Sequence, residues 1–140
     1  MILVDYQLIG VDISLDAIRA CRFDRRCIPK LSKEIKLPQP AMPGAVTVAL
    51  CDQIETIDPE FQATYIGVTI PGKIALNGRV LEFCKEFPGW IDVPLADWLE
   101  TRLSRKVTLI DSVKCSNIGD FHESKIKTID ESFFLSLGAA

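Results

Sequence analysis

The stretch YQLIGVDISLDAIRACRFDRRCIPKLSKEIKL, residues 6–37, decides the fold of this chain. It contains three extended runs, residues 6–14, 17–23 and 28–37, in which side chains alternate between two faces, as in β-strands. The turn between the first two runs is SLD, residues 14–16, which is short enough for a hairpin. The stretch therefore predicts a sheet that begins with three strands joined in order.

Helical and extended segments alternate in the rest of the chain. Prolines at 38, 40 and 43 mark a loop, because proline has no N–H for a strand ladder. Val46, Leu50 and Ile54 recur at helical spacing and predict an amphipathic helix over residues 44–57. The later predictions are a strand at 63–70, a hairpin turn at Asn77-Gly78, an irregular stretch at 87–94, a helix at 95–103, a strand at 107–111, a short helix capped by Ser112 that runs through Phe121, and a strand at 132–140.

A sheet led by hairpin strands and continued through crossover helices predicts an α/β fold with a mixed sheet. In such folds a ligand binds beyond the carboxyl ends of the strands. Four strand ends carry residues that suit a site and should converge there: Asp12, Pro71-Gly72, Asp111-Ser112 and Gly138.

The size and charge of the chain narrow the classes of protein it could be. Its 140 residues, 48% of them hydrophobic, suit one domain with one core. The net charge of -3 argues against nucleic-acid binding, which favours a basic face. A local basic cluster is interpreted as a solvated strand and turn; it comprises Arg19, Arg22, Arg25, Arg26 and Lys30.

Neither export nor membrane insertion is indicated by the sequence, and we expect a cytoplasmic protein. No apolar run approaches the roughly 20 residues that span a bilayer.

Trp90 and Trp98 are expected in the core, and His122 on the surface. The five cysteines have no metal-ligand spacing and are interpreted as reduced thiols, mostly packed as small hydrophobes: Cys21, Cys27, Cys51, Cys84 and Cys115.

Six segments together resemble the ROK family of sugar kinases and repressors, which includes bacterial glucokinases, over residues 8–140. They are GVDISLDAIRACRFD, IGVTIPG, NGRV, FPGWIDVPLADWLETRL, VTLIDSVKCSNIGD and FFLSLGAA. The resemblance implies an actin-like, ribonuclease-H-like ATPase fold. It also implies that residues 1–131 form an N-terminal lobe and that residues 132–140 begin a second lobe, where the family has its zinc site and adenosine pocket. No metal site is therefore expected in this chain.

The family's first strand ends in D-x-G-G-T-K, whose glycines let the backbone approach ATP phosphates. Asp12 matches the family aspartate and is the candidate phosphate-site residue, although a strand-end turn role explains it equally well. Leu15 and Asp16 replace a glycine and the threonine, so they bring bulk and negative charge to the turn. We expect weak phosphate binding there.

Ser112 stands where the family has the aspartate that takes the proton from the sugar hydroxyl. A serine hydroxyl cannot act as this base near neutral pH, so no intact catalytic residue is expected. Asp111 matches a family asparagine that binds sugar, but it should point to the opposite face from Ser112. Helix capping is the simpler role for this pair.

Two further positions would contact sugar by the same resemblance. Pro71 and Gly72 match the family, although a sharp turn explains them without a ligand, and Glu86 replaces an asparagine in the sugar loop. A carboxylate accepts hydrogen bonds from hydroxyls, so the expected sugar contact is altered rather than lost.

Three functions fit these residues. The preferred one is a catalytically degenerate sugar kinase-like domain that retains weak hexose or partner binding and needs no cofactor. The second is the N-terminal lobe of an active hexose kinase, which would need ATP and Mg²⁺. The third is an unrelated α/β interaction module. The apolar strand at 133–137 predicts self-association, or a second chain that covers an exposed lobe face.

Overall fold

A computed structural model describes residues 6–112 of the chain. The predicted three-stranded start is confirmed by β1 (Gln7–Ile13), β2 (Ala17–Phe23) and β3 (Pro29–Lys36). β1 pairs antiparallel with β2, and β2 pairs antiparallel with β3, through a tight turn after Ile13 and a longer one after Phe23. The hairpin order read from residues 6–37 is therefore the order in space.

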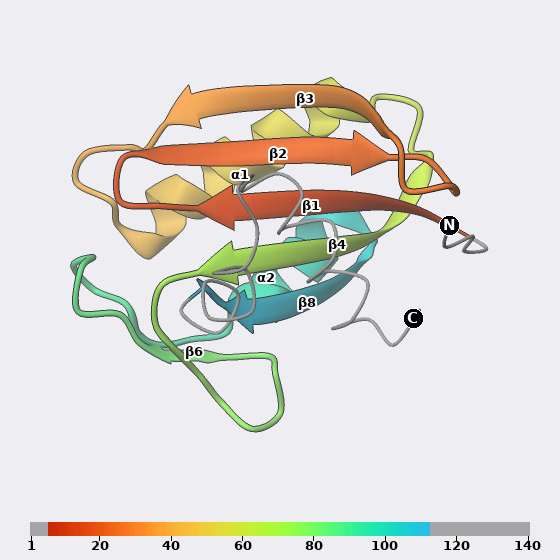
Figure 1. Ribbon diagram of the computed structural model, residues 1–140. Coiled ribbons are helices and arrows are strands. Elements are labelled where there is room, and N and C mark those ends of the chain that lie inside the picture. Colours follow the sequence, from red (N-terminus) through yellow and green to blue (C-terminus); the bar gives the residue numbers. More distant parts are fainter. Residues whose placement is uncertain (1–5, 113–140) are drawn as a thin grey trace, which may run out of the picture.

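Two crossover helices then add parallel strands to the same sheet (Figure 1). The elements are α1 (Pro43–Ile57), β4 (Ala63–Ile70), α2 (Leu95–Leu103) and β8 (Lys106–Asp111). The sheet order is β3-β2-β1-β4-β8, with β4 parallel to both β1 and β8. The fold is the mixed α/β architecture that the sequence predicts.

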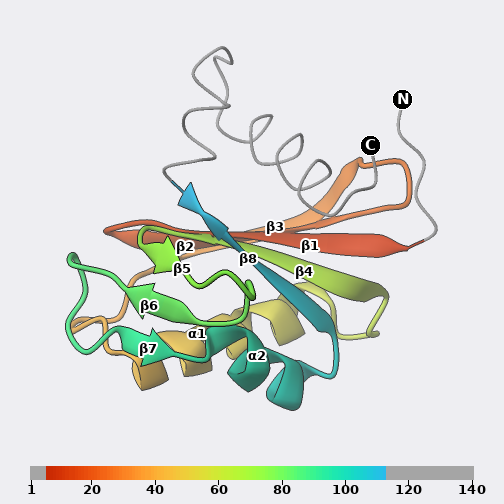
Figure 2. The same ribbon diagram turned by 90° about the horizontal axis from the view of Figure 1, so that it is seen from below.

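Both helices lie against one face of the sheet (Figure 2). Val46, Leu50 and Ile54 of α1 are fully buried there, so the helical spacing seen in the sequence does mark the packed side. Val11 of β1 and Val68 of β4 belong to the same core cluster. Strand alternation therefore assigns odd-numbered positions of β1 to the helix side, and even-numbered ones, including residue 12, to the opposite side.

A second, three-stranded sheet is formed by β5 (Lys73–Ile74), β6 (Leu81–Phe83) and β7 (Ile91–Val93). β5 and β6 form the hairpin predicted at Asn77-Gly78. β7 corrects the expectation that residues 87–94 are wholly irregular: Val93 pairs with Leu81 in β6, and both are buried. Pairing with a distant strand, rather than local periodicity, makes this segment extended.

The two tryptophans have different environments. Trp90 is buried as predicted, and its indole Nε1 donates to the Ala41 carbonyl at 2.6 Å. Trp98 is 40% exposed, so its prediction as a core residue is wrong. The buried side of α2 is formed by Leu95, Ala96, Leu99 and Leu103, and Trp98 is not among these residues.

Arg79 connects the β5–β6 hairpin to α2 through ion pairs. Its guanidinium lies 2.6 Å from Asp97 and 2.8 Å from Glu100. Glu100 in turn accepts a hydrogen bond from the Val107 N–H at the start of β8. The side-chain hydrogen bond from Arg79 lowers the pKa of Glu100, so this carboxylate is held in its charged form.

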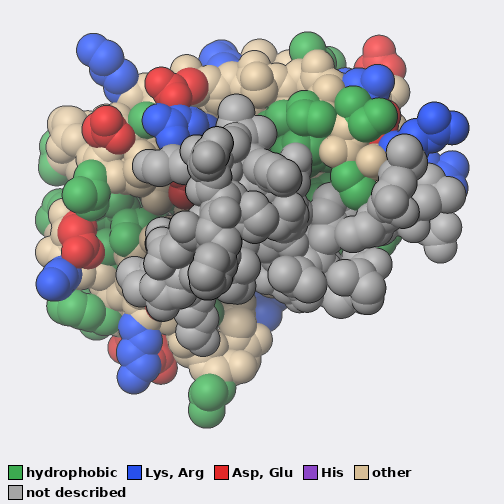
Figure 3. Space-filling model, viewed as in Figure 1, with side chains coloured by type: hydrophobic (Ala, Val, Ile, Leu, Met, Phe, Trp, Pro, Cys, Tyr) green, Lys and Arg blue, Asp and Glu red, His purple; other side chains and the backbone are tan. Residues whose placement is uncertain are grey.

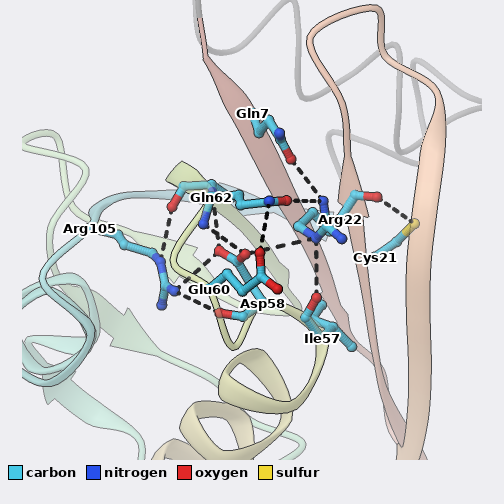
Figure 4. A network of polar contacts seen from close by, with 9 residues as sticks. Gln7, Cys21, Arg22, Ile57, Asp58, Glu60, Gln62 and Arg105 are labelled. Atoms are coloured by element: carbon cyan, nitrogen blue, oxygen red, sulfur yellow. Dashed lines mark hydrogen bonds and ion pairs between the residues drawn. The ribbon is translucent and has the colours of Figure 1, made fainter.

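A buried polar network lies at the end of the five-stranded sheet where the parallel strands begin (Figure 4). Asp58, which ends α1, accepts hydrogen bonds from the N–H groups of Gln62 and Ala63, and lies 3.2 Å from Arg105. The side chains of Asp58 and Arg105 are only 1% and 3% exposed. Arg105 also donates to the Ala63 carbonyl and lies over the ring of Phe61.

Arg22 belongs to this network, which corrects its interpretation as part of a solvated basic cluster. It donates to the Ile57 carbonyl and to the side-chain oxygens of Gln7 and Gln62, and lies 3.8 Å from Asp58. Its side chain is 14% exposed. Two of its partners, Ile57 and Gln62, come 35 and 40 residues later in the chain, and hydrogen bonds to them keep the Arg22 side chain largely buried.

Within residues 6–112, no helix combines the length and the apolar character needed to cross a membrane. Two of the four cysteines in that range, Cys51 and Cys84, are buried, as expected for thiols packed as small hydrophobes. Cys21 and Cys27 are half-buried. Cys115 and His122 lie outside the described residues.

Candidate functional site at the carboxyl ends of the parallel strands

Parallel pairing aligns three of the predicted strand ends. Asp12 of β1 is in register with Thr69 of β4, and Ile70 of β4 is in register with Asp111 of β8. The small sheet follows directly from β4 and lies near the arrowhead ends of β4 and β8 (Figure 1). Gly138, the fourth predicted member, lies outside the described residues.

Asp12 is held by a neighbouring strand. The Thr69 hydroxyl lies 2.6 Å from Asp12 Oδ1 and 3.3 Å from the Val11 carbonyl, so its one proton favours the carboxylate. Thr69 is buried and Asp12 is half-buried. One carboxylate oxygen is thus anchored within the sheet, on the face away from the helices.

Ser14 makes the internal hydrogen bonds of the turn between β1 and β2. The Ser14 N–H donates to the Ala17 carbonyl at 2.9 Å, and the Ser14 hydroxyl lies 3.0 Å from the Asp16 carboxylate. Leu15, at the tip, is 61% exposed. The turn therefore presents an apolar side chain and a carboxylate to solvent.

The charges around this turn do not suit a polyphosphate. Phosphate sites use backbone N–H groups and cations, whereas Asp16 brings a negative charge. Arg19, opposite Asp12 in β2, is engaged by Glu34 of β3. Acidic and basic side chains are interspersed around the described margin of this face (Figure 3). The residues present are a poor fit to the phosphates of ATP.

Side-chain alternation assigns Asp111 to one face of the sheet. Val107 and Leu109 of β8 pack in the core on the helix side, whereas Ile110 packs with Leu8 on the opposite side. Asp111, the last residue of β8, therefore occupies a helix-side position. Ser112 follows the strand, so the strand period does not assign its side chain to a face. Ser112 is the last described residue, and both it and Asp111 are half-buried. The helix predicted after Ser112 lies outside the described residues.

Gly72 has a structural explanation. Its φ is +151°, and a Cβ at this position would lie 2.6 Å from the Phe83 carbonyl oxygen. Only glycine allows β4 to turn this closely against β6. The tight turn expected at Pro71-Gly72 is present, and it needs no bound sugar.

Glu86 lies in the loop between β6 and β7 and is exposed. The Cys84 thiol lies 3.7 Å from its carboxylate, within the range of a weak sulfur hydrogen bond. Burial raises the pKa of the Cys84 thiol, so the thiol stays protonated and acts as the donor. Glu86 is therefore accessible to a polar ligand.

No set of three or more His, Cys, Asp or Glu side chains suited to a metal ion occurs within residues 6–112. Sequence reasoning missed the Asp58–Arg105 network and the role of Arg79, because their partners come from segments far apart in the chain. The Asn-Gly turn placed Arg79 at a hairpin, but no local pattern identified Asp97 and Glu100 as its partners.

Comparison with known proteins identifies the family. The sequence model of the ROK family matches residues 8–139. The chain belongs to the ROK family. A resemblance of architecture alone, the third reading of the sequence, therefore does not account for this chain.

Relatives in the ROK family include sugar kinases. A glucokinase from Thermotoga maritima is 34% identical over 67 residues, which cover 48% of this chain and 21% of the glucokinase. The inorganic polyphosphate/ATP-glucomannokinase from Arthrobacter sp. strain KM superposes with a TM-score of 0.71 and 24% identity, over 83% of this chain and 48% of that one. A ROK glucokinase from Streptomyces griseus, solved with glucose and AMPPNP, has a TM-score of 0.72 and 20% identity, over 82% and 36%.

The chain thus spans less than half the length of each of these relatives. The structural matches confirm the actin-like ATPase fold expected from the resemblance. The division into a lobe at 1–131 and the start of another at 132–140 stays a prediction, because residues 113–140 lie outside the described range.

Proposed function

We propose that this chain is a ROK sugar kinase-like domain that binds a hexose weakly at the carboxyl edge of its sheet and does not itself transfer phosphate. The observation that carries the proposal is the β1–β2 turn. The Ser14 N–H and hydroxyl bond within the turn, and the turn presents Leu15 and Asp16 where a phosphate would need N–H groups or a cation.

The residue after β8 supports the same proposal. By the family resemblance, Ser112 stands at the position of the base that takes the proton from the sugar hydroxyl, and serine is no base near neutral pH. A positioned base contributes roughly 10²–10⁴-fold to such reactions. Asp111 is one residue away and occupies the helix side of the strand, so it is poorly placed to replace the base.

Sugar binding would use the groups that remain accessible. Glu86 is an exposed acceptor, Asp111 is half-buried, and Asp12 has one carboxylate oxygen that is not anchored by Thr69. Sugar hydroxyls donate well to carboxylates, so these groups suit a hexose better than they suit a polyphosphate. A cytoplasmic location is part of this proposal, in keeping with the expectation from the sequence.

A second candidate function is the N-terminal lobe of an active, ATP-dependent hexose kinase. Its support is the 34% identity to the Thermotoga maritima glucokinase, together with the short span that the chain covers of its relatives. Such a kinase would need ATP, Mg²⁺ and a hexose, as well as a second half that binds the nucleotide. It would also need a base other than Ser112.

Two measurements separate these functions. Calorimetry and thermal shift with glucose, mannose and N-acetylmannosamine test binding, because a ligand that binds only the folded state raises its melting temperature. A coupled ADP-release assay tests turnover against a Ser112→Ala control. The proposal requires a sugar-dependent shift and no turnover above that control. Absence of any shift at millimolar sugar, or turnover that Ser112→Ala abolishes, contradicts it.

Restoring the base alone is a stricter test. We predict that the Ser112→Asp variant shows no measurable phosphorylation of sugar, because the β1–β2 turn still carries Leu15 and Asp16. Activity in this variant would mean that the turn binds phosphate after all. The predicted self-association through residues 133–137 is tested separately by light scattering, where a strict monomer at high concentration argues against it.

A further inference from the structure

The tip of the β5–β6 hairpin carries a reactive pair of residues. We propose that Asn77 is a site of spontaneous modification, in which the backbone nitrogen of Gly78 displaces the side-chain amide and converts Asn77 to aspartate and isoaspartate. This inference is independent of sugar binding. It rests on the geometry of the turn and on the elementary chemistry of an asparagine followed by glycine.

The turn exposes the asparagine side chain and places no side chain on the residue that supplies the attacking nitrogen. Asn77 is exposed, and Leu76 beside it is fully solvated. Gly78 has a φ of +71°, and a Cβ built there would meet nothing within 4 Å, so no neighbouring segment crowds the space beside its Cα. A side chain on the following residue is what normally protects an asparagine, and Gly78 has none.

Two backbone hydrogen bonds close the tip itself, which precedes the Arg79 that attaches the hairpin to α2. The Gly78 N–H donates to the Ala75 carbonyl at 2.9 Å, and the Ala75 N–H donates to the Val80 carbonyl at 2.9 Å. β5 contributes only two residues to the sheet. Short surface hairpins of this kind open locally at a small fraction of the cost of global unfolding, and opening frees the Gly78 nitrogen.

The asparagine carbonyl is also polarised. Asn77 Oδ1 accepts a hydrogen bond from the Arg79 backbone N–H at 2.8 Å, which draws electron density from the carboxamide carbon. The Gly78 nitrogen loses its proton to solvent base and forms a bond to this carbon. The side-chain nitrogen then takes up a proton from solvent and leaves as ammonia as its bond to this carbon breaks, and a cyclic imide remains. Water adds to either imide carbonyl, so one product is aspartate and the other is isoaspartate.

The two products differ in their effect on Arg79. Aspartate keeps an oxygen that accepts from the Arg79 N–H. Isoaspartate lengthens the main chain by one carbon, two residues before the guanidinium that binds Asp97 and Glu100. The isoaspartate form should therefore loosen the attachment of the small sheet to α2, whereas the aspartate form should not.

To test the proposal, the purified full chain is aged in mildly alkaline buffer at physiological temperature. Peptide mapping by mass spectrometry then locates the loss of ammonia, and enzymatic methylation detects isoaspartate. The other asparagine in the chain, Asn117, is followed by a β-branched isoleucine and is an internal control. We expect ammonia loss and isoaspartate at Asn77 well before Asn117. The Gly78→Ala variant should slow conversion severalfold, and Asn77→Gln, whose cyclic product would need a larger ring, should slow it further.

Two outcomes overturn the proposal: Asn77 persists as long as Asn117, or the Gly78→Ala and Asn77→Gln variants lose ammonia at this site as fast as the parent chain. The consequence for Arg79 is tested by urea unfolding of the aged, separated isoaspartate form. It should unfold at lower urea than both the fresh chain and Asn77→Asp. Equal midpoints for all three would remove the link to Arg79.

Discussion

Replacing Asp58 by alanine is the most informative perturbation of the fold. The substitution removes the acceptor for the Gln62 and Ala63 N–H groups and the counter-charge of Arg105, whose side chain is only 3% exposed. Gln62 is exposed, so its N–H recovers a partner in water. Ala63 and Arg105 are buried and do not.

The expected loss follows from those two buried groups. Breaking a buried ion pair by removing one partner destabilises proteins by about 3–5 kcal/mol, because the remaining charge is uncompensated. Domains of this size are stable by roughly 5–15 kcal/mol, so the change should lower the urea midpoint by a large fraction. Asp58→Asn preserves the volume but puts an NH₂ group among donors, and should lose at least half as much.

Urea unfolding followed by far-UV circular dichroism measures this loss. Asp52→Ala is the matched control on the same helix, since that carboxylate is 68% exposed and 4.0 Å from Arg102, and should cost under about 1 kcal/mol. Adding Arg105→Met to Asp58→Ala should recover part of the stability, because it removes the unpaired charge. Equal midpoints for Asp58→Ala and Asp52→Ala would refute the reasoning.

Two other predictions concern the small sheet. Arg79 holds the pKa of Glu100 below its usual range. The stability that this pair contributes is therefore present above the unfolded-state pKa of about 4.3, and it is lost as the pH falls through the folded-state pKa. Glu100→Gln should flatten that part of the plot of urea midpoint against pH. An unchanged acid limb would contradict it. Gly72→Ala should destabilise the protein by about 1–3 kcal/mol, because φ is +151° and the new Cβ would meet the Phe83 carbonyl. Gly44→Ala is the control, because a Cβ there meets nothing within 4 Å, and it should be neutral or stabilising in the same urea unfolding experiment.

Local patterns in the sequence were sufficient wherever one segment carried its own signal. The strands at 17–23 and 63–70 and the helix at 95–103 have the predicted bounds, because alternation, a continuous apolar run and helical spacing each extend over the whole element. The segment 91–93 is different. It is three residues long, between Gly89 and Pro94, and becomes a strand only by pairing with β6.

Side chains that depend on distant partners were also beyond local patterns. Arg105 meets Asp58 across 47 residues, and Arg22 meets Ile57 across 35. At the candidate site, alternation along β8 assigns Asp111 to the helix side, but the expectation that Ser112 faces the opposite side stays a prediction, because Ser112 follows the end of the strand. The hydrogen bond between Asp12 and Thr69 was not predictable, because it needs the parallel register of β1 and β4.

The two edges of the sheet differ in what they contribute. The edge where the parallel strands begin is fixed by Asp58 and Arg105, which are buried and saturated with partners. The edge where they end carries Leu15 and Glu86, which are exposed, and Asp12, which is half-buried. Exposed groups can usually be replaced at little cost to folding, whereas the loss of one partner of a buried ion pair leaves an uncompensated charge. A ROK chain could therefore lose its phosphate turn and its base while its fold persists. Variants at the carboxyl edge should then report on ligand binding without unfolding the protein.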